Sequence, residues 1–168
     1  RLKDHVIVVG YGRMGQQICQ SLMARHHPFV VIDKDDSRLN GMNGDTVPII
    51  HGDGGNEDVL NKAGIDRSRA LVAATGSDAD NLFVVMSARL MAPTLKILAR
   101  ADHAAIQQME AITITAPRHD HRLDSREIAR MDTIVVTTAS DSEQVIDLIN
   151  QAQIFRFLNK PVSVRLLK

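Results

Sequence analysis

The 168-residue sequence has no excess of positive charge and only one cysteine, and each of these features excludes a class of function. Lysine and arginine together number 20, the same as aspartate and glutamate. The chain therefore has no excess of positive charge with which to bind a nucleic-acid backbone or an anionic membrane surface. The single cysteine, Cys19, cannot form a disulfide within the chain and has no companion for a thiolate metal site. A lone cysteine is typical of a reducing compartment, so we expect a cytoplasmic protein. Because the charges balance, we expect no nucleic-acid partner.

Long hydrophobic runs are also missing. No apolar run reaches the roughly 20 residues that a membrane-spanning helix requires, and the segment Arg1–His5 lacks the apolar core of a signal peptide. The first residue is not methionine. We therefore expect a piece of a longer protein, whose remainder can include a membrane segment.

What the sequence does contain is a regular alternation of short apolar runs and helical patterns between His5 and Ala116. Such alternation is typical of βαβ units, and it predicts an α/β fold: a Rossmann-like, doubly wound parallel sheet with helices on both faces. The predicted strands are Val6–Val9, Phe29–Ile32, Val47–Ile50, Ala70–Ala74, Leu95–Ala99 and Ile112–Thr115.

Two helical patterns between these strands predict which side chains face the core. The first stripe comprises Met14, Ile18, Cys19, Leu22 and Met23, and the second comprises Leu82, Val85, Met86, Arg89 and Leu90. Apolar residues at this spacing are usually packing residues, so we assign the methionines and Cys19 to the core.

The character of the sequence changes after Ala116. Residues 117–131 begin with Pro117, are rich in charge, and are predicted to be a linker followed by a short helix. Residues 132–168 are predicted to form an additional βαβ segment, with strands at Thr133–Thr138 and Ile154–Leu158 and a helix at Ser142–Gln151. The predicted domain thus covers residues 1–116.

A glycine-rich loop joins the first predicted strand to the first predicted helix, and its sequence is Gly10-Tyr11-Gly12-Arg13-Met14-Gly15. In a G-x-G-x-x-G loop the first glycine permits the tight turn, the second lets the backbone approach a pyrophosphate, and the third lets the helix pack on the strand. The N-terminus of the helix attracts an anion, and Arg13 can add a charged contact. We predict a phosphate-binding loop, while a glycine-rich turn without a ligand stays the alternative.

Asp33 ends the second predicted strand about 20 residues further on, where the dinucleotide fingerprint places an acidic residue that binds ribose hydroxyls. A carboxylate there repels a 2′-phosphate, so NAD(H) or an adenosine nucleotide is favoured over NADP, although Lys34 beside it weakens the exclusion. The alternative role for Asp33 is a helix cap or a solvated turn residue.

Two more strand ends should meet the same crevice, because ligands of open parallel sheets lie beyond the carboxyl ends of the strands. The third strand leads into His51–Gly55, where small residues such as Gly54 admit an adenine and Asp53 can bond it or cap the next helix. The fourth leads into Thr75–Asp78. Taken singly, each is an ordinary βα loop.

Together these residues resemble the N-terminal lobe of an RCK domain, the regulator of potassium conductance, over about Asp4 to Ala101. The resemblance rests on the stretches Asp4–Gly15, Pro28–Asp33, Gly52-Asp53 ahead of Val59-Leu60, Ala63–Ile65, Ala73–Thr75, Asp78–Leu82 and Ala99–Ala101.

This resemblance implies a homodimeric regulatory domain, located in the cytoplasm at the inner face of the membrane, that gates a potassium channel or cation transporter. The ligand it implies is NAD(H), AMP, ADP or ATP, and the matching ligand positions are the Gly10 loop, Asp33, Asp53, Thr75 and Arg100. The chain departs from the family pattern at Gly54 and Gly55, where Ala or Thr is usual after the Gly-Asp pair, so the adenine contacts are expected to differ.

Residues 132–168 instead resemble the last third of a response-regulator receiver domain, through Val135–Ala139 and the Lys160-Pro161 pair. The upstream acidic pair and phosphoacceptor aspartate of a receiver are not recognisable, so we do not expect aspartyl phosphorylation. A generic βαβ piece is the alternative reading.

The sequence offers no nucleophile elbow, Walker loop or zinc motif, and we therefore expect a binding domain and not an enzyme. His119-Asp120-His121 lies in the predicted linker without a second cluster, so no metal is expected. The alternatives to a regulatory domain are an NAD-dependent oxidoreductase fragment and a signalling hybrid with a receiver-like segment.

Overall fold

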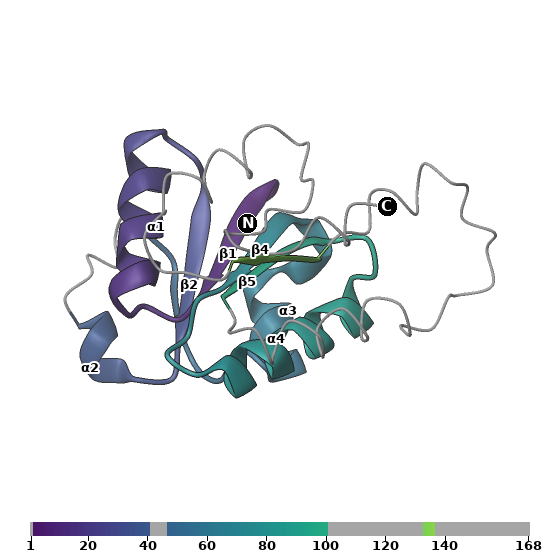
Figure 1. Ribbon diagram of the computed structural model, residues 1–168. Coiled ribbons are helices and arrows are strands. Elements are labelled where there is room, and N and C mark those ends of the chain that lie inside the picture. The colour runs from purple at the N-terminus through teal and green to yellow at the C-terminus, as the bar shows by residue number, and fades with distance from the viewer. Residues whose placement is uncertain (1, 41–46, 101–132, 137–168) are drawn as a thin grey trace, which may run out of the picture.

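The computed structural model describes residues 2–40, 47–100 and 133–136, which form a wholly parallel sheet flanked by helices (Figure 1). The described strands are β1 (His5–Val9), β2 (Phe29–Asp33), β3 (Ile49–His51), β4 (Ser68–Ala73), β5 (Lys96–Arg100) and β6 (Thr133–Val136). Their order in the sheet is β3-β2-β1-β4-β5-β6. The direction of winding reverses between β1 and β4, and this reversal opens a crevice at the carboxyl ends of the strands.

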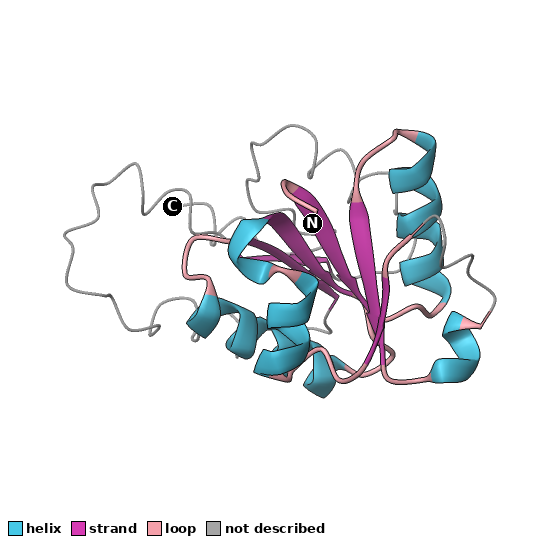
Figure 2. Cartoon of the chain, turned by 180° about the vertical axis from the view of Figure 1, so that it is seen from behind, coloured by secondary structure: helices cyan, strands magenta, loops and turns pink. Residues whose placement is uncertain are grey.

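Helices lie on both sides of the sheet (Figure 2). They are α1 (Arg13–Ala24), α2 (Asp36–Leu39), α3 (Glu57–Ala63) and α4 (Asp78–Met91), with a 3₁₀ turn at Ile65–Arg67. Successive side chains of a strand point to opposite faces of the sheet. In β1, Val6 and Val8 pack with α1, whereas Ile7 and Val9 pack with α3 and α4. Both faces are therefore buried, which explains why the strands are apolar runs without polar alternation. The predicted doubly wound α/β fold is confirmed.

The predicted core faces of the two long helices need correction. On α1, Met23 is 51% exposed, although the other four predicted positions are buried. On α4, Met86 and Leu90 are 39% and 60% exposed. The buried residues of α4 are Asn81, Val84, Val85, Ser87, Ala88 and Arg89.

The α4 error has a simple geometric cause. The predicted stripe 82, 85, 86, 89 and 90 is the buried stripe 81, 84, 85, 88 and 89 displaced by one residue, which turns the helix by about 100°. The prediction looked for apolar residues at helical spacing, so it chose Leu82 and passed over Asn81, which is polar.

Strand positions agree with the predictions to within two residues, except where the chain lies outside the described residues. The predicted strand Ile112–Thr115 lies outside them, as do the predicted helix Ser142–Gln151 and strand Ile154–Leu158. The predicted strand at Thr133 is present as β6, and its register pairs Ile97 with Thr133 and Arg100 with Val136. β6 lies in the same sheet as β1–β5. The division of the chain at residues 116 and 132 stays a prediction.

Candidate functional site

The glycine loop follows β1 at the centre of the sheet and leads directly into α1. Gly10 has φ +96°, and its N–H donates to the carbonyl of Ile32 at 2.8 Å. A Cβ at Gly10 would lie 2.8 Å from the backbone of Ala74, and a Cβ at Gly15 would overlap the carbonyl of Gly10. The fold itself therefore requires glycine at both positions, for the turn and for the approach of α1 to the loop.

Gly12 is different, because nothing lies within 4 Å of the position that its Cβ would occupy. Its backbone has φ −73° and ψ −168°, an extended conformation that any residue adopts. Neither packing nor backbone strain within the described residues explains a glycine there.

The N-terminus of α1 also differs from the other described α-helices. Asp35, Asn56 and Ser77 cap α2, α3 and α4 with side-chain hydrogen bonds, and each of these helices has an acidic residue in its first turn. The N-cap residue of α1 is Gly12, so α1 has no side-chain cap bond, and its first turn has no acidic residue. Its backbone amides and its dipole are thus available to an anion, and Arg13 adds positive charge at the same turn.

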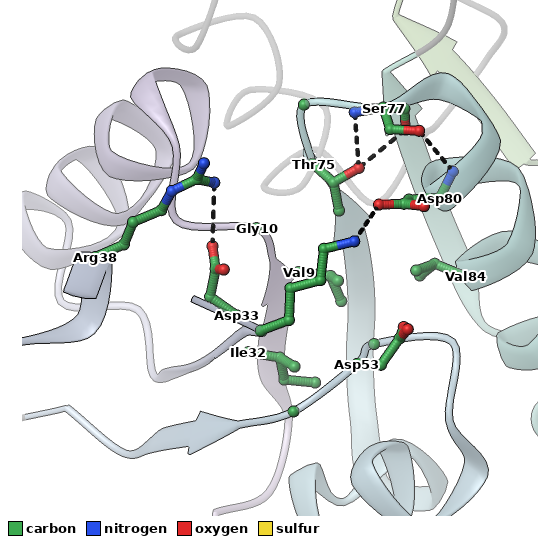
Figure 3. A pocket seen from close by; sticks show the side chains of 14 residues that line it. Val9, Gly10, Ile32, Asp33, Arg38, Asp53, Thr75, Ser77, Asp80 and Val84 are labelled. Atoms are coloured by element: carbon green, nitrogen blue, oxygen red, sulfur yellow. Dashed lines mark hydrogen bonds and ion pairs between the residues drawn. The ribbon is translucent and has the colours of Figure 1, made fainter. Parts of the chain in front are cut away.

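Asp33 is 5% exposed and organises the loop from the end of β2. Its Oδ2 accepts a 2.6 Å hydrogen bond from the N–H of Tyr11, and its Oδ1 accepts from the N–H of Asp35 at 2.8 Å. Arg38 on α2 approaches Oδ2 to 3.8 Å (Figure 3). Asp33 is therefore neither a solvated turn residue nor the cap of α2, which is Asp35.

A pocket of about 170 Å³ lies at the carboxyl ends of the strands, beside the reversal point of the sheet (Figure 3). Its apolar floor consists of Val9, Ile32 and Val84. Its rim holds Gly10, Asp33, Lys34, Arg38, Gly52, Asp53, Gly54, Thr75, Gly76, Ser77 and Asp80. An apolar floor with a few converging polar groups is the usual character of a small-molecule site.

Of the predicted site residues, the structure brings six into the wall of this pocket: Gly10, Asp33, Lys34, Asp53, Gly54 and Thr75. The others, Tyr11, Gly12, Arg13, Met14, Gly15 and Arg100, are not part of that wall. Of these, Met14 and Gly15 are buried in the packing of α1 on the sheet. A Cβ at Gly54 would overlap the side chain of Val9, so the floor of the pocket already requires its small size.

Asp53 forms a turn and does not cap the next helix. Its Oδ1 accepts from the N–H of Gly55 at 2.8 Å, while the cap of α3 is Asn56, whose Oδ1 accepts from Asp58 and Val59. The capping alternative for Asp53 is therefore wrong, and its carboxylate stands on the pocket rim (Figure 3).

Lys34 and Asp80 join the two sides of the pocket. The Nζ of Lys34, which follows β2, lies 2.7 Å from Oδ2 of Asp80 in the first turn of α4. The hydrogen bond and charge of Asp80 raise the pKa of Lys34 above its ordinary value. Both side chains are exposed, so this ion pair spans the pocket at its surface.

Thr75 and Arg100 meet through a network with Asn81. Asn81 is fully buried, accepts a hydrogen bond from the N–H of Thr75 at 2.9 Å and donates one to the carbonyl of Arg100 at 2.9 Å. The guanidinium of Arg100 donates to the carbonyl of Thr75 at 3.4 Å. Arg100 thus contacts the pocket loop without lining the pocket.

Sequence reasoning placed the loops His51–Gly55 and Thr75–Asp78 at this crevice but gave Gly52, Gly76 and Ser77 no ligand role of their own. It missed Arg38, Asp80 and Val84, and it gave Asn81 no role. Gly76 carried a usable sequence signal, because it stands in a βα loop at the carboxyl end of a predicted strand. In the structure nothing lies within 4 Å of its Cβ position. Arg38 and Asp80 carried none, since helical surfaces are ordinarily rich in such charges.

Within the described residues there is no cluster of histidine, cysteine, aspartate or glutamate suited to a metal ion. The predicted solvated segment His119-Asp120-His121 lies outside those residues. Over the same part of the chain, every helix is too short or too polar to cross a bilayer.

Fold and glycine loop together define the class of the protein, a Rossmann-like α/β domain. The chain belongs to the TrkA-N domain family, which it matches over residues 6–116. Among curated relatives it is similar to "Probable potassium channel protein 2" of Methanocaldococcus jannaschii, with 39% identity over 104 residues, 60% of this chain and 30% of that protein. The chain covers less than a third of the length of the first curated relatives.

Solved structures agree with this family. The TrkA-N domain of the inner membrane protein YbaL from Escherichia coli is 27% identical with a TM-score of 0.60, and the match covers 77% of this chain and 93% of that one. The Kef C-terminal domain of Shewanella denitrificans, solved in an AMP-bound form, is 26% identical with a TM-score of 0.58, covering 88% and 90% of the two chains.

Proposed function

We propose that this chain is a nucleotide-sensing regulatory domain that binds NAD(H) or an adenine nucleotide and thereby gates a potassium channel or cation transporter. The observation that carries the proposal is the N-terminus of α1, which has no side-chain cap. Gly12 has free space where its Cβ would stand, and α1 is the only α-helix of the described residues without a side-chain cap. A phosphate group bound there would supply the acceptors that the helix amides lack.

The pocket supports binding of the ribose and base of such a nucleotide. Its volume of about 170 Å³ is below the roughly 300–1,000 Å³ of sites that enclose a whole small ligand, so it fits one part of a nucleotide. The carboxylate of Asp33, between the loop and the pocket, is suited to ribose hydroxyls, and the apolar floor with Asp53 at its rim is suited to a base.

The relatives support the regulatory half of the proposal. The relative named "Probable potassium channel protein 2" is 39% identical to this chain over 104 residues, and the Kef domain binds AMP in a structure of the same fold. On this proposal the chain is not an enzyme; it works in the cytoplasm at the inner face of the membrane, as a homodimer attached to a membrane segment or subunit. Ligand binding would shift a two-state assembly because the ligand binds one state more tightly.

The test is a titration of the full chain with AMP, ADP, ATP, NAD⁺ and NADH, followed by thermal unfolding. A ligand at 100 times its Kd stabilises the folded state by about 2.7 kcal/mol, which raises the Tm by several degrees. Gly12→Asp is the informative variant, because aspartate is a good cap in this extended conformation but repels a phosphate. Gly12→Ser is its matched control, which caps the helix without adding charge.

We expect Gly12→Asp to keep or raise the Tm of the free protein and to abolish the nucleotide-dependent increase. Gly12→Ser should raise the Tm of the free protein and weaken binding less. Wild type that gains no stability from any of the five nucleotides at millimolar concentration would refute the proposal. A Gly12→Asp variant stabilised as much as wild type would place the ligand away from α1.

A further inference from the structure

Asn81 is a fully buried polar side chain in the first turn of α4, and its partners fix the orientation of its amide. The N–H of Thr75 can only donate and the carbonyl of Arg100 can only accept. The side-chain oxygen of Asn81 therefore faces Thr75 at 2.9 Å, and its nitrogen faces Arg100 at 2.9 Å. A buried amide with both ends bonded holds its neighbours in one arrangement.

One end of this amide reaches the wall of the pocket. The Oγ1 of Thr75 lies 2.8 Å from Oδ1 of Asn81 and 2.9 Å from the carbonyl of Ser77, and Thr75, Gly76 and Ser77 all line the pocket. The N–H of Ser77 in turn donates to Oγ1 of Thr75 at 3.3 Å. A ligand that moves this loop moves the oxygen to which Asn81 is bonded.

The other end reaches the last residue of β5. The carbonyl of Arg100 accepts from Asn81, and the guanidinium of Arg100 returns to the carbonyl of Thr75 at 3.4 Å. Arg100 is also the register partner of Val136 in β6. Two side chains thus link the pocket loop to the end of β5, Arg100 and Asn81, and Asn81 is the one that is fully buried.

We propose that Asn81 is the positioning residue that couples occupancy of the pocket to the carboxyl end of β5 and, through its register, to β6. The proposal rests on the proposed nucleotide site. The side chain of Asn81 does not line the pocket, so it acts on a ligand through the loop Thr75–Ser77. Its oxygen accepts only from Thr75, whereas its nitrogen donates to the carbonyl of Arg100 at 2.9 Å and, at 3.5 Å, to the carbonyl of Thr75.

The experiment is backbone hydrogen exchange of the full chain with and without saturating AMP, read at Ile97–Arg100 and Thr133–Val136. In wild type we expect AMP to slow exchange at these amides by about tenfold, as for a segment whose local opening becomes less frequent. Asn81→Asp keeps acceptor oxygens for the N–H and hydroxyl of Thr75 and loses the donor to the carbonyl of Arg100, together with the longer bond to the carbonyl of Thr75. It should therefore bind AMP within about threefold of wild type, while the AMP-dependent slowing falls below about twofold.

Ser87→Ala is the matched control, since Ser87 is also buried on α4 but does not line the nucleotide pocket, and it should keep the full AMP-dependent slowing. If Asn81→Asp does not fold, Asn81→Ser removes the long amide with less strain and should lose the slowing as well. Equal slowing in wild type and the Asn81 variants would overturn the inference. Wild type that binds AMP without slowing would overturn the inference alone, whereas wild type that binds no nucleotide would overturn the proposed function too.

Discussion

The carboxylate of Asp33 accepts a 2.6 Å hydrogen bond from the backbone N–H of Tyr11, and this bond ties the end of β2 to the glycine loop. The second carboxylate oxygen accepts from the N–H of Asp35 at 2.8 Å. Asp33 therefore shapes the loop even without a ligand, and its proposed contact with ribose is made by a group that is already held in place. Such preorganisation lowers the entropic cost of binding.

Asp33→Asn is expected to destabilise the chain and to weaken nucleotide binding. An amide has one acceptor oxygen, so it cannot accept from both N–H groups, and an unpaired buried donor costs about 1–3 kcal/mol. Asp53→Asn is the matched control, because Asp53 bonds only the N–H of Gly55 in the described structure; its cost should stay below about 1 kcal/mol. Chemical denaturation measures both values, and equal losses would contradict the assigned role of Asp33.

Alanine substitutions in the glycine loop should separate fold from function. Gly10→Ala places a Cβ 2.8 Å from the backbone of Ala74 at φ +96°, so we expect strain of about 1–3 kcal/mol from the backbone alone. Gly12→Ala meets no atom within 4 Å and should change the free energy of unfolding by less than about 1 kcal/mol. Its nucleotide affinity should nevertheless fall. A Gly12→Ala variant that binds nucleotide like wild type would show that the space is not used by a ligand.

Features that depend on residues close together in the sequence could be predicted from it. The doubly wound sheet and the glycine loop follow from short apolar runs, from helical patterns of period 3.6 and from glycine spacing. Asp33 was found because a fixed chain distance links it to that loop. The burial of Asp33 and its bond to Tyr11, 22 residues away, depend on the sheet and were not predictable.

The parts that sequence reasoning missed are set by contacts between distant segments. The Lys34–Asp80 pair spans 46 residues and the Asn81–Arg100 bond spans 19. Polar Asn81 sits on the buried face of α4 because it bonds the ends of two strands, and apolar periodicity alone cannot predict such a residue. The same polar residue displaced the predicted helix face by one position.

Breaking the Lys34–Asp80 pair should change binding more than stability. Both side chains are exposed, and solvent screens such a pair, so its contribution to the free energy of unfolding should be small. Asp80→Asn removes a carboxylate from the pocket rim and frees the Lys34 ammonium, so the affinity for an anionic nucleotide should rise. Lys34→Met, which keeps the aliphatic stem, should lower that affinity. Isothermal titration of both variants decides the matter, and a fall in affinity for Asp80→Asn would contradict it.

The pKa of Lys34 gives an independent measurement of the same pair. Asp80 raises this pKa above its ordinary value of 10.5, so the stabilising contribution is present below that value and is lost as the pH rises through the folded-state pKa. Asp80→Asn should move the pKa of Lys34 down towards its ordinary value. The ¹³C shift of its ε carbon, followed against pH, reports the change, and an unmoved titration would mean that the two side chains are apart in solution.

Cys19 should make the stability of the chain fall at alkaline pH. Burial in the α1 core raises the pKa of its thiol from 9.0 to about 12. A raised folded-state pKa stabilises fully below the unfolded value, so the stabilisation is lost as the pH rises from about 9 towards about 12. Cys19→Ala costs stability at pH 7 because it leaves a small cavity, but it should lose less on going to pH 10.5 than wild type does. Chemical denaturation of both proteins at the two pH values measures how much more stability the wild type loses, about 2 kcal/mol if the folded-state thiol stays protonated throughout.

Equal losses in the two proteins would mean that Cys19 ionises in the folded state as readily as in the unfolded chain. The 1% exposure of Cys19 argues against that outcome.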